Sequence, residues 1–305
     1  MIKRIFIVLL LTGASFRAMA CDVCGCSLSG LYFGYMSLQD RNLIGLQYSR
    51  ATFSAYIDND DYYFEDEYSN DTYQRVDLTG KFSITNKLQV RYIVPYMFNS
   101  MNGSHQNVDA NGIGDPIVMA YYNVLNTSDK LEGVWHSLEV GGGFELPVGD
   151  YDMEDQGELI NRNFQLGSGS LDYILSANYI IRTGKWGINT EGSYKLNTTN
   201  SHEYRFGNQW NVSASVFRYF ETQSVSFLPF AGVYYEFGDY HELNGIREAN
   251  TGGKSLLGTL GGQLYLSRLT FNTQYQFIID QSFNTDEFAT IEGGNRFTFG
   301  VFYSF

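Results

Sequence analysis

The chain has 305 residues, and its 24 Tyr, 23 Phe and 32 Gly against only 4 Pro favour strands and turns over helices. Its formal net charge of −13 at pH 7 argues against a nucleic-acid partner, because an acidic surface repels a polyanion. No run of about 18 apolar residues follows Ala20, which excludes transmembrane helices, so only a β-barrel could span a membrane.

The chain begins with a pattern that is typical of a secretory signal peptide. Lys3 and Arg4 precede a short apolar run over 5–11, and Ala18-Met19-Ala20 forms an A-x-A cleavage site. We therefore expect a signal peptide over 1–20, a periplasmic cysteine-containing segment over 21–41 and a barrel over 42–305, in a Gram-negative bacterium.

All three cysteines lie in the segment Cys21-Asp22-Val23-Cys24-Gly25-Cys26. Cys21 directly follows the cleavage site, so it is either the lipidated first residue of a lipoprotein or the first residue left by ordinary cleavage. The soft thiolates of Cys21, Cys24 and Cys26 would suit copper as Cu(I), or zinc, although three ligands are one short of a closed zinc site. A structural disulfide is the alternative in an oxidising periplasm.

From residue 42 onward, apolar and polar residues alternate to the end of the chain. In the second stretch Val76, Leu78 and Phe82 share one parity, whereas Arg75, Asp77 and Lys81 share the other, so one face suits lipid and the other water. Each stretch is close to or longer than the roughly nine to eleven residues that a tilted strand needs to cross a bilayer. The predicted strands are 42–57, 73–85, 88–98, 113–126, 134–147, 164–181, 185–197, 207–220, 224–237, 254–266, 269–280 and 295–305.

The connections between these strands separate a membrane barrel from a soluble β-sandwich, which also alternates. Long and short connections largely take turns along the chain, as they do in outer-membrane barrels, and an even strand number puts both termini in the periplasm. The sequence thus predicts an all-β protein: a transmembrane, antiparallel up-and-down β-barrel of about 12 strands, surrounded by the lipid of the cell outer membrane.

Three short motifs resemble a known family. They are Gly112-Ile113-Gly114-Asp115-Pro116, Glu145-Leu146-Pro147-Val148-Gly149-Asp150 and Leu166-Gly167-Ser168-Gly169-Ser170. The pattern is similar to that of the outer-membrane transporters named after the meta-pathway of phenol degradation, over roughly residues 76–305. The resemblance implies a barrel that moves small molecules across the outer membrane, and it supplies no catalytic residues. The cysteine-containing segment departs from the family pattern.

Charged residues of both signs occupy the parity that would face the lumen. They could form a selectivity ring or a translocation path, or they could pair with one another and fill a closed lumen. These lumen candidates are Arg75, Asp77, Lys81, Arg91, Glu139, Glu145, Asp172, Glu191 and Lys195.

The last stretch has a continuous apolar face made of Phe297, Phe299, Val301, Tyr303 and Phe305. Its pattern, with Gly300, Tyr303 and Phe305 at the constrained positions, resembles the carboxy-terminal signal by which the barrel-assembly machinery recognises and inserts barrels. We expect this strand to pair with the strands at 269–280 and 42–57 and so to close the wall.

The sequence therefore predicts an outer-membrane channel or transporter for a small solute. The alternative is a non-transporting outer-membrane protein that uses its N-terminal cysteines to handle copper or another metal, or to dock a periplasmic metal-handling partner. We expect no enzyme, since no G-x-S-x-G, phosphate loop or paired-carboxylate motif occurs.

Overall fold

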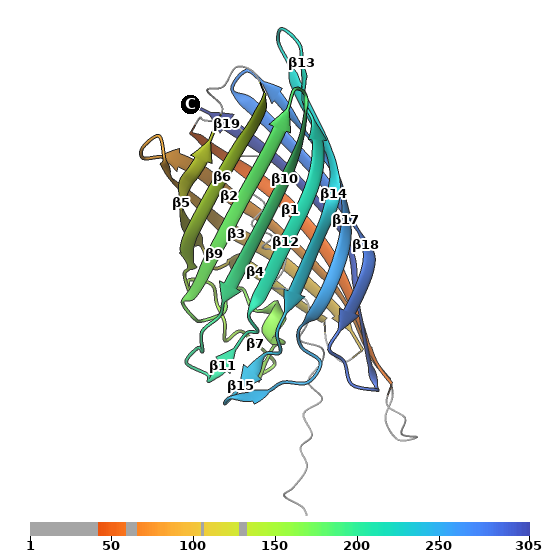
Figure 1. Ribbon diagram of the computed structural model, residues 1–305. Coiled ribbons are helices and arrows are strands. Elements are labelled where there is room, and N and C mark those ends of the chain that lie inside the picture. Colours follow the sequence, from red (N-terminus) through yellow and green to blue (C-terminus); the bar gives the residue numbers. More distant parts are fainter. Residues whose placement is uncertain (1–41, 59–65, 105–106, 128–132) are drawn as a thin grey trace, which may run out of the picture.

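The computed structural model describes residues 42–58, 66–104, 107–127 and 133–305, and these form one closed antiparallel barrel (Figure 1). β4 and β5 together make one wall strand, which gives the twelve strands expected from the sequence. Among the described residues no helix is long and apolar enough to cross a membrane. The wall strands are β1 (Leu43–Ile57), β2 (Glu67–Ser83), β3 (Leu88–Gly103), β4 (Asn107–Ile113) with β5 (Ile117–Asn126), β6 (Val134–Glu145), β9 (Asp172–Thr183), β10 (Trp186–Leu196), β12 (Gln209–Arg218), β14 (Ser226–Gly238), β17 (Gly253–Leu266), β18 (Leu269–Phe283) and β19 (Ala289–Ser304).

The first and last strands close the barrel, as predicted. β1 pairs with β19 from Leu43 opposite Ser304 to Ile57 opposite Ala289, and β19 also pairs with β18. Every wall strand thus has a neighbour on both sides, which satisfies the backbone hydrogen-bonding groups that lipid cannot.

The alternation in sequence becomes an apolar outer wall and a polar interior. Leu46, Leu175 and Ile279 are each more than 50% exposed on the outer face. Inside, Asn178 donates to Asn189 at 2.8 Å, one of many buried polar contacts. An outer surface this apolar is stable only in contact with lipid.

The interruption between β4 and β5 lies beside Pro95, a residue that lacks a backbone donor. β3 pairs with β5 up to Ile93 opposite Ile117 and with β4 from Tyr96 opposite Ile113, and Gly114 donates its N–H to the carbonyl of Pro95 at 2.9 Å. The proline therefore falls where the neighbouring strand is broken, which is how a barrel tolerates it.

One predicted strand was wrong at its start. A strand was expected over 164–181, but β9 begins at Asp172 and 164–171 belong to a loop that folds inward. Alternation misled here because 166, 168 and 170 are buried at a spacing of two although they belong to the loop, where 163–166 are buried in succession. The short elements outside the wall are β7 (Glu154–Asp155), β8 (Glu158–Leu159), η4 (Arg162–Phe164), β11 (Tyr204–Arg205), β13 (Phe220–Glu221), β15 (Glu242–Leu243) and β16 (Ile246–Arg247).

The two ends of the barrel differ. Figure 1 shows β7, β11 and β15 gathered at the end opposite the C terminus, which we call the loop end. At the C-terminal end the turns are short: two residues join β9 to β10, and two join β17 to β18. The elements that could restrict passage are therefore concentrated at the loop end.

Candidate functional site: the lumen and its inward loop

The connection between β6 and β9, residues 146–171, folds into the mouth of the barrel. We call it the inward loop. Its Ile160, Phe164 and Leu166 are buried against the inner face of the wall. The ring of Phe164 lies 5.0 Å from the ring of Tyr73 on β2, centroid to centroid. The wall side of this cluster comes from β1 to β4 and β19, so the loop fills one side of the lumen: Ala51, Phe53, Tyr73, Met101, Val108, Ala110 and Ile291.

The inward loop is held in shape by its own polar groups. The side chain of Gln165 accepts a hydrogen bond from the Met153 N–H at 2.9 Å and donates to the carbonyls of Met153 and Ile160 at 3.1 and 3.3 Å. The N–H groups of Leu166 and Gly167 both donate to the carbonyl of Asp150, at 2.8 and 2.9 Å. The two ends of the loop thus lie side by side, as they do in a compact Ω-loop.

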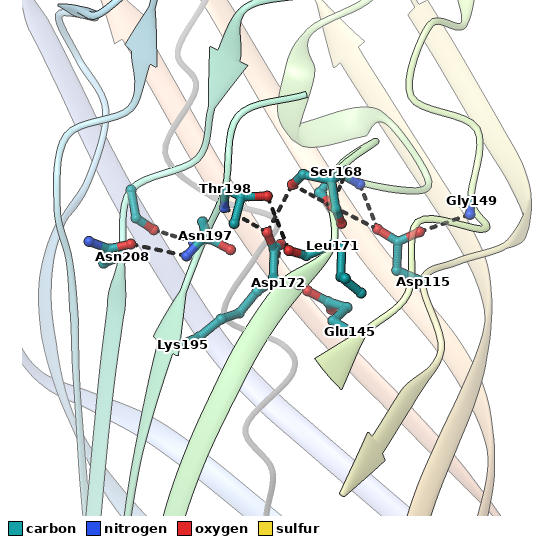
Figure 2. Close-up of polar contacts among 12 residues, drawn as sticks. Asp115, Glu145, Gly149, Ser168, Leu171, Asp172, Lys195, Asn197, Thr198 and Asn208 are labelled. Carbon is teal, nitrogen blue, oxygen red and sulfur yellow. Dashed lines mark hydrogen bonds and ion pairs between the residues drawn. The ribbon is translucent and has the colours of Figure 1, made fainter. Parts of the chain in front are cut away.

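Asp115 joins the inward loop to the wall. Its Oδ1 accepts hydrogen bonds from the N–H groups of Val148 and Gly149, at 2.9 and 2.8 Å. Its Oδ2 accepts from the N–H and the hydroxyl of Ser168, at 2.7 and 3.0 Å. One carboxylate from the β4–β5 interruption therefore satisfies four donors at the two ends of the loop (Figure 2).

Two glycines allow this close approach. A Cβ on Gly149 would lie 2.6 Å from the carbonyl oxygen of Leu166, and a Cβ on Gly167 would lie 2.6 Å from Asp115 Oδ1. Neither position has room for a side chain. The three motifs, around Gly114-Asp115, Val148-Gly149 and Gly167-Ser168, thus form one structural unit although they lie far apart in sequence.

A second carboxylate, Asp172, connects the base of the inward loop to the next one. Its Oδ1 accepts from the Ser170 hydroxyl at 2.9 Å and from the Thr198 N–H at 2.8 Å. Lys195 Nζ lies 3.7 Å from Asp172 Oδ2 and also forms an ion pair with Glu145. Figure 2 shows Glu145, Asp172 and Lys195 pointing toward one another inside the wall.

The nine lumen candidates all lie on the inner face, and most of them are in ion pairs. Arg75 pairs with Asp77 at 3.0 Å, and Arg91 pairs with Glu139 at 2.5 Å while its guanidinium lies 4.0 Å from the Tyr121 ring centroid. Lys195 pairs with Glu145 and Asp172 as described. Lys81 and Glu191 are also buried. Whether these residues select a solute remains a prediction.

An ion pair between two further charged residues of the lumen was missed in the sequence. Arg296 on β19 makes a bidentate ion pair with Glu236 on β14, at 2.8 and 2.5 Å. Arg296 has the polar parity of the last strand, so its position was detectable. Glu236 was not, because β14 carries apolar residues on both faces.

The remaining predicted site residues divide into two groups. Cys21, Cys24 and Cys26, with the proposed lipidation and metal site, lie outside the described residues, as does the signal peptide. Of the carboxy-terminal pattern, Gly300 lies on the inner face, whereas Tyr303 and Phe305 are 43% and 54% exposed on the outer face.

The loop between β14 and β17 contains a buried histidine. Nδ1 of His241 lies 2.7 Å from the hydroxyl oxygen of Tyr204, and its backbone N–H donates to Thr251 at 3.0 Å. Burial lowers the pKa of His241 to about 3.

This pKa shift predicts that the loop is less stable in acid. The unfolded loop takes up a proton below the ordinary histidine pKa of about 6.5, whereas the folded loop does not until about pH 3. Loop stability is therefore full above about pH 6.5 and falls as the pH decreases toward 3. Hydrogen exchange at the His241 and Glu248 amides, corrected for intrinsic rates, should show protection falling between pH 7 and 4. His241→Gln should remove this dependence; an equal dependence in the variant would refute the assignment.

A closed antiparallel wall, an apolar outer face and a polar, ion-paired interior define a transmembrane barrel of the outer-membrane type. The chain belongs to the family described as "Putative MetA-pathway of phenol degradation", which matches residues 49–285. The resemblance of the three motifs to this family is thereby confirmed. A search of curated protein sequences gave no match.

Solved structures share the fold. The COG4313 outer membrane channel from Pseudomonas putida F1 is similar with a TM-score of 0.62 and 14% identity, over 87% of this chain and 96% of that one. A Pseudomonas aeruginosa FadL homologue is similar with a TM-score of 0.45 and 10% identity, over 89% of this chain and 92% of that one. The first of these supports the barrel architecture.

Proposed function

We propose that the protein is an outer-membrane channel that passes a small solute through a narrow, polar lumen. The observation that carries this proposal is the inward loop, which is fixed by Asp115 and narrows the loop end of a polar barrel without replacing its charged interior. A barrel that served only as an anchor would need no such construction. The structural similarity to a protein described as an outer membrane channel supports the same role.

The lumen favours selective passage over a wide, unspecific pore. Apolar clusters lie toward both ends of the interior. One surrounds Phe164 near the loop end, and another surrounds Phe217 and Phe230 toward the other end. The ion pairs of Arg91 and Arg296 are buried in the interior, whereas Lys195 lines a cavity and can offer a polar contact to a solute. Charges that face each other across a lumen can select by sign and size.

The unequal ends of the barrel support one orientation in the membrane. We place the C-terminal end, with its short turns, in the periplasm and the loop end outside the cell. The N-terminal segment would then lie in the periplasm. Insertion would depend on the barrel-assembly machinery, which would recognise the last strand.

Neither of the other candidate functions gains a supporting observation. The alternative role in copper or zinc handling, with a periplasmic metal-handling partner, rests on three cysteines outside the described residues. Within the described residues no group of three or more His, Cys, Asp and Glu side chains could hold a metal ion. The absence of enzymatic activity stays a prediction, which the similarity to an outer membrane channel supports.

Liposome swelling with the purified protein tests the channel. We expect uptake of glycerol and glucose but little uptake of a trisaccharide, because the inward loop narrows the lumen. A variant in which a short glycine linker replaces 151–165 should admit larger solutes, and its ends are suited to joining because the Leu166 N–H donates to the Asp150 carbonyl at 2.8 Å. A protein that inserts but gives neither conductance nor uptake would refute the proposal.

A further inference from the structure

A cavity lies between the inward loop and the wall, at the level of the charged residues. Arg75, Arg162 and Lys195 contribute three cationic side chains to its lining, and Ile93, Met97 and Phe206 contribute an apolar part. The cavity therefore combines positive groups with an apolar surface, which is how sites for small amphipathic molecules are built.

The three cations differ in how they are neutralised. Arg75 is paired with Asp77 at 3.0 Å, and Lys195 is paired with Glu145 and Asp172. Arg162 has no carboxylate within ion-pair distance among the described residues. Its guanidinium carbon lies 4.9 Å from the ring centroid of Tyr204, a contact that leaves the positive charge uncompensated.

Arg162 is also incompletely hydrogen-bonded. Its Nη1 is shielded from solvent and has no acceptor among the described residues. A shielded donor of a charged group without an acceptor is costly, and a bound acceptor would remove that cost. Arg162 begins η4, a single turn whose backbone is held by Asn161 and Gln165, and its side chain lines the cavity.

The carboxylates of the same cavity restrict what can bind. Both oxygens of Asp115 are occupied by Val148, Gly149 and Ser168. Glu145 shares the single ammonium of Lys195 with Asp172, a carboxylate outside the cavity lining. This side of the cavity therefore has surplus negative charge. When one anionic group of a solute is bound to Arg162, this negative charge repels a second anionic group on the same solute.

We propose that Arg162 is the carboxylate-binding residue of a solute site in the lumen, and that the site accepts small monocarboxylates with an apolar body. The guanidinium binds the carboxylate through its fork of donors, and Ile93, Met97 and Phe206 contact the apolar body. The inference rests on the proposed channel function for its role in the cell, but the binding itself does not require conductance.

Equilibrium binding to the full chain in detergent micelles tests the site, with benzoate, benzamide and terephthalate as probes. We expect benzoate to bind at least about tenfold more tightly than benzamide, its uncharged counterpart, and than terephthalate, its dicarboxylate counterpart. Arg162→Gln should weaken benzoate binding by about tenfold or more and leave benzamide unchanged. Arg162→Lys should fall between, because it keeps the charge but loses the fork.

Arg205→Gln is the matched control. Arg205 also lies at the loop end, but its guanidinium is paired with Glu242 at 2.7 Å and it does not line the cavity. Its loss should leave benzoate binding unchanged. Equal benzoate binding by the native protein and a folded Arg162→Gln variant would overturn the proposal, as would the absence of benzoate binding to the native protein. If the native protein bound benzoate but showed no conductance, the channel function would be refuted and the binding site would stand.

Discussion

Asp115→Ala is expected to release the inward loop from the wall and to enlarge the lumen. The substitution leaves three backbone N–H groups and one hydroxyl without their acceptor, at Val148, Gly149 and Ser168. Hydrogen bonds to a charged group contribute about 1.5–3 kcal/mol each and are not additive, so local stability should fall by at least about 3 kcal/mol. Hydrogen exchange at the Gly149 and Ser168 amides should accelerate about 100-fold or more. Single-channel conductance should rise.

Asp109→Ala provides the comparison for this experiment. Asp109 lies on β4 close to Asp115 in sequence, but its side chain is exposed. Its removal should change neither exchange at Gly149 nor conductance. Asp115→Asn should give an intermediate result, since one carbonyl oxygen can replace only part of the acceptor set. If Asp115→Ala left the exchange of the loop amides unchanged, the carboxylate would not be what fixes the loop.

The barrel could be predicted from the sequence because each wall strand has to meet two simple conditions. Lipid outside and polar groups inside impose a period of two, as Val76, Leu78 and Phe82 against Arg75, Asp77 and Lys81 illustrate. The length of each alternating stretch, which is close to what a tilted strand needs to cross a bilayer, then identifies it as a membrane-spanning strand. The same rule failed for 164–171, because a loop folded into the lumen meets the same apolar and polar surroundings without being part of the wall.

The candidate site was only partly predictable. Parity placed Arg91 and Glu139 on the inner face, but which charges pair depends on strand tilt and register, which the sequence does not show. Asp115 was visible only as part of a family motif. Its role depends on two loop segments more than thirty residues away, at Gly149 and Ser168, whose approach requires glycine rather than any recognisable polar pattern. Arg162 was not singled out, because a lone arginine in a loop has no distinguishing sequence pattern.

Replacing Tyr303 and Phe305 with Ser is expected to prevent assembly into the membrane while leaving export to the periplasm intact. Both side chains lie on the outer face at the C-terminal end, where β19 closes against β1. The Tyr303 hydroxyl accepts from Arg268 at 3.0 Å, and the Phe305 ring packs edge-on against Phe82 at 5.8 Å between centroids. The double substitution removes the aromatic part of the insertion pattern together with these contacts to the β17–β18 turn and to β2. Most of the folded, heat-modifiable protein should disappear from the outer-membrane fraction.

A matched double substitution separates recognition from loss of apolar surface. Tyr275 and Phe277 of β18 are also on the outer face, 44% and 38% exposed, but they are distant from the C terminus. Tyr275→Ser with Phe277→Ser removes one Tyr and one Phe ring from lipid just as the terminal pair does, so both variants lose similar transfer free energy. If the terminal strand is a recognition signal, membrane levels should fall much further for the terminal pair. Equal membrane levels for the two variants would mean that the last strand is an ordinary wall strand and not a recognition signal. Any outward-facing pair of aromatic residues would then contribute equally to assembly.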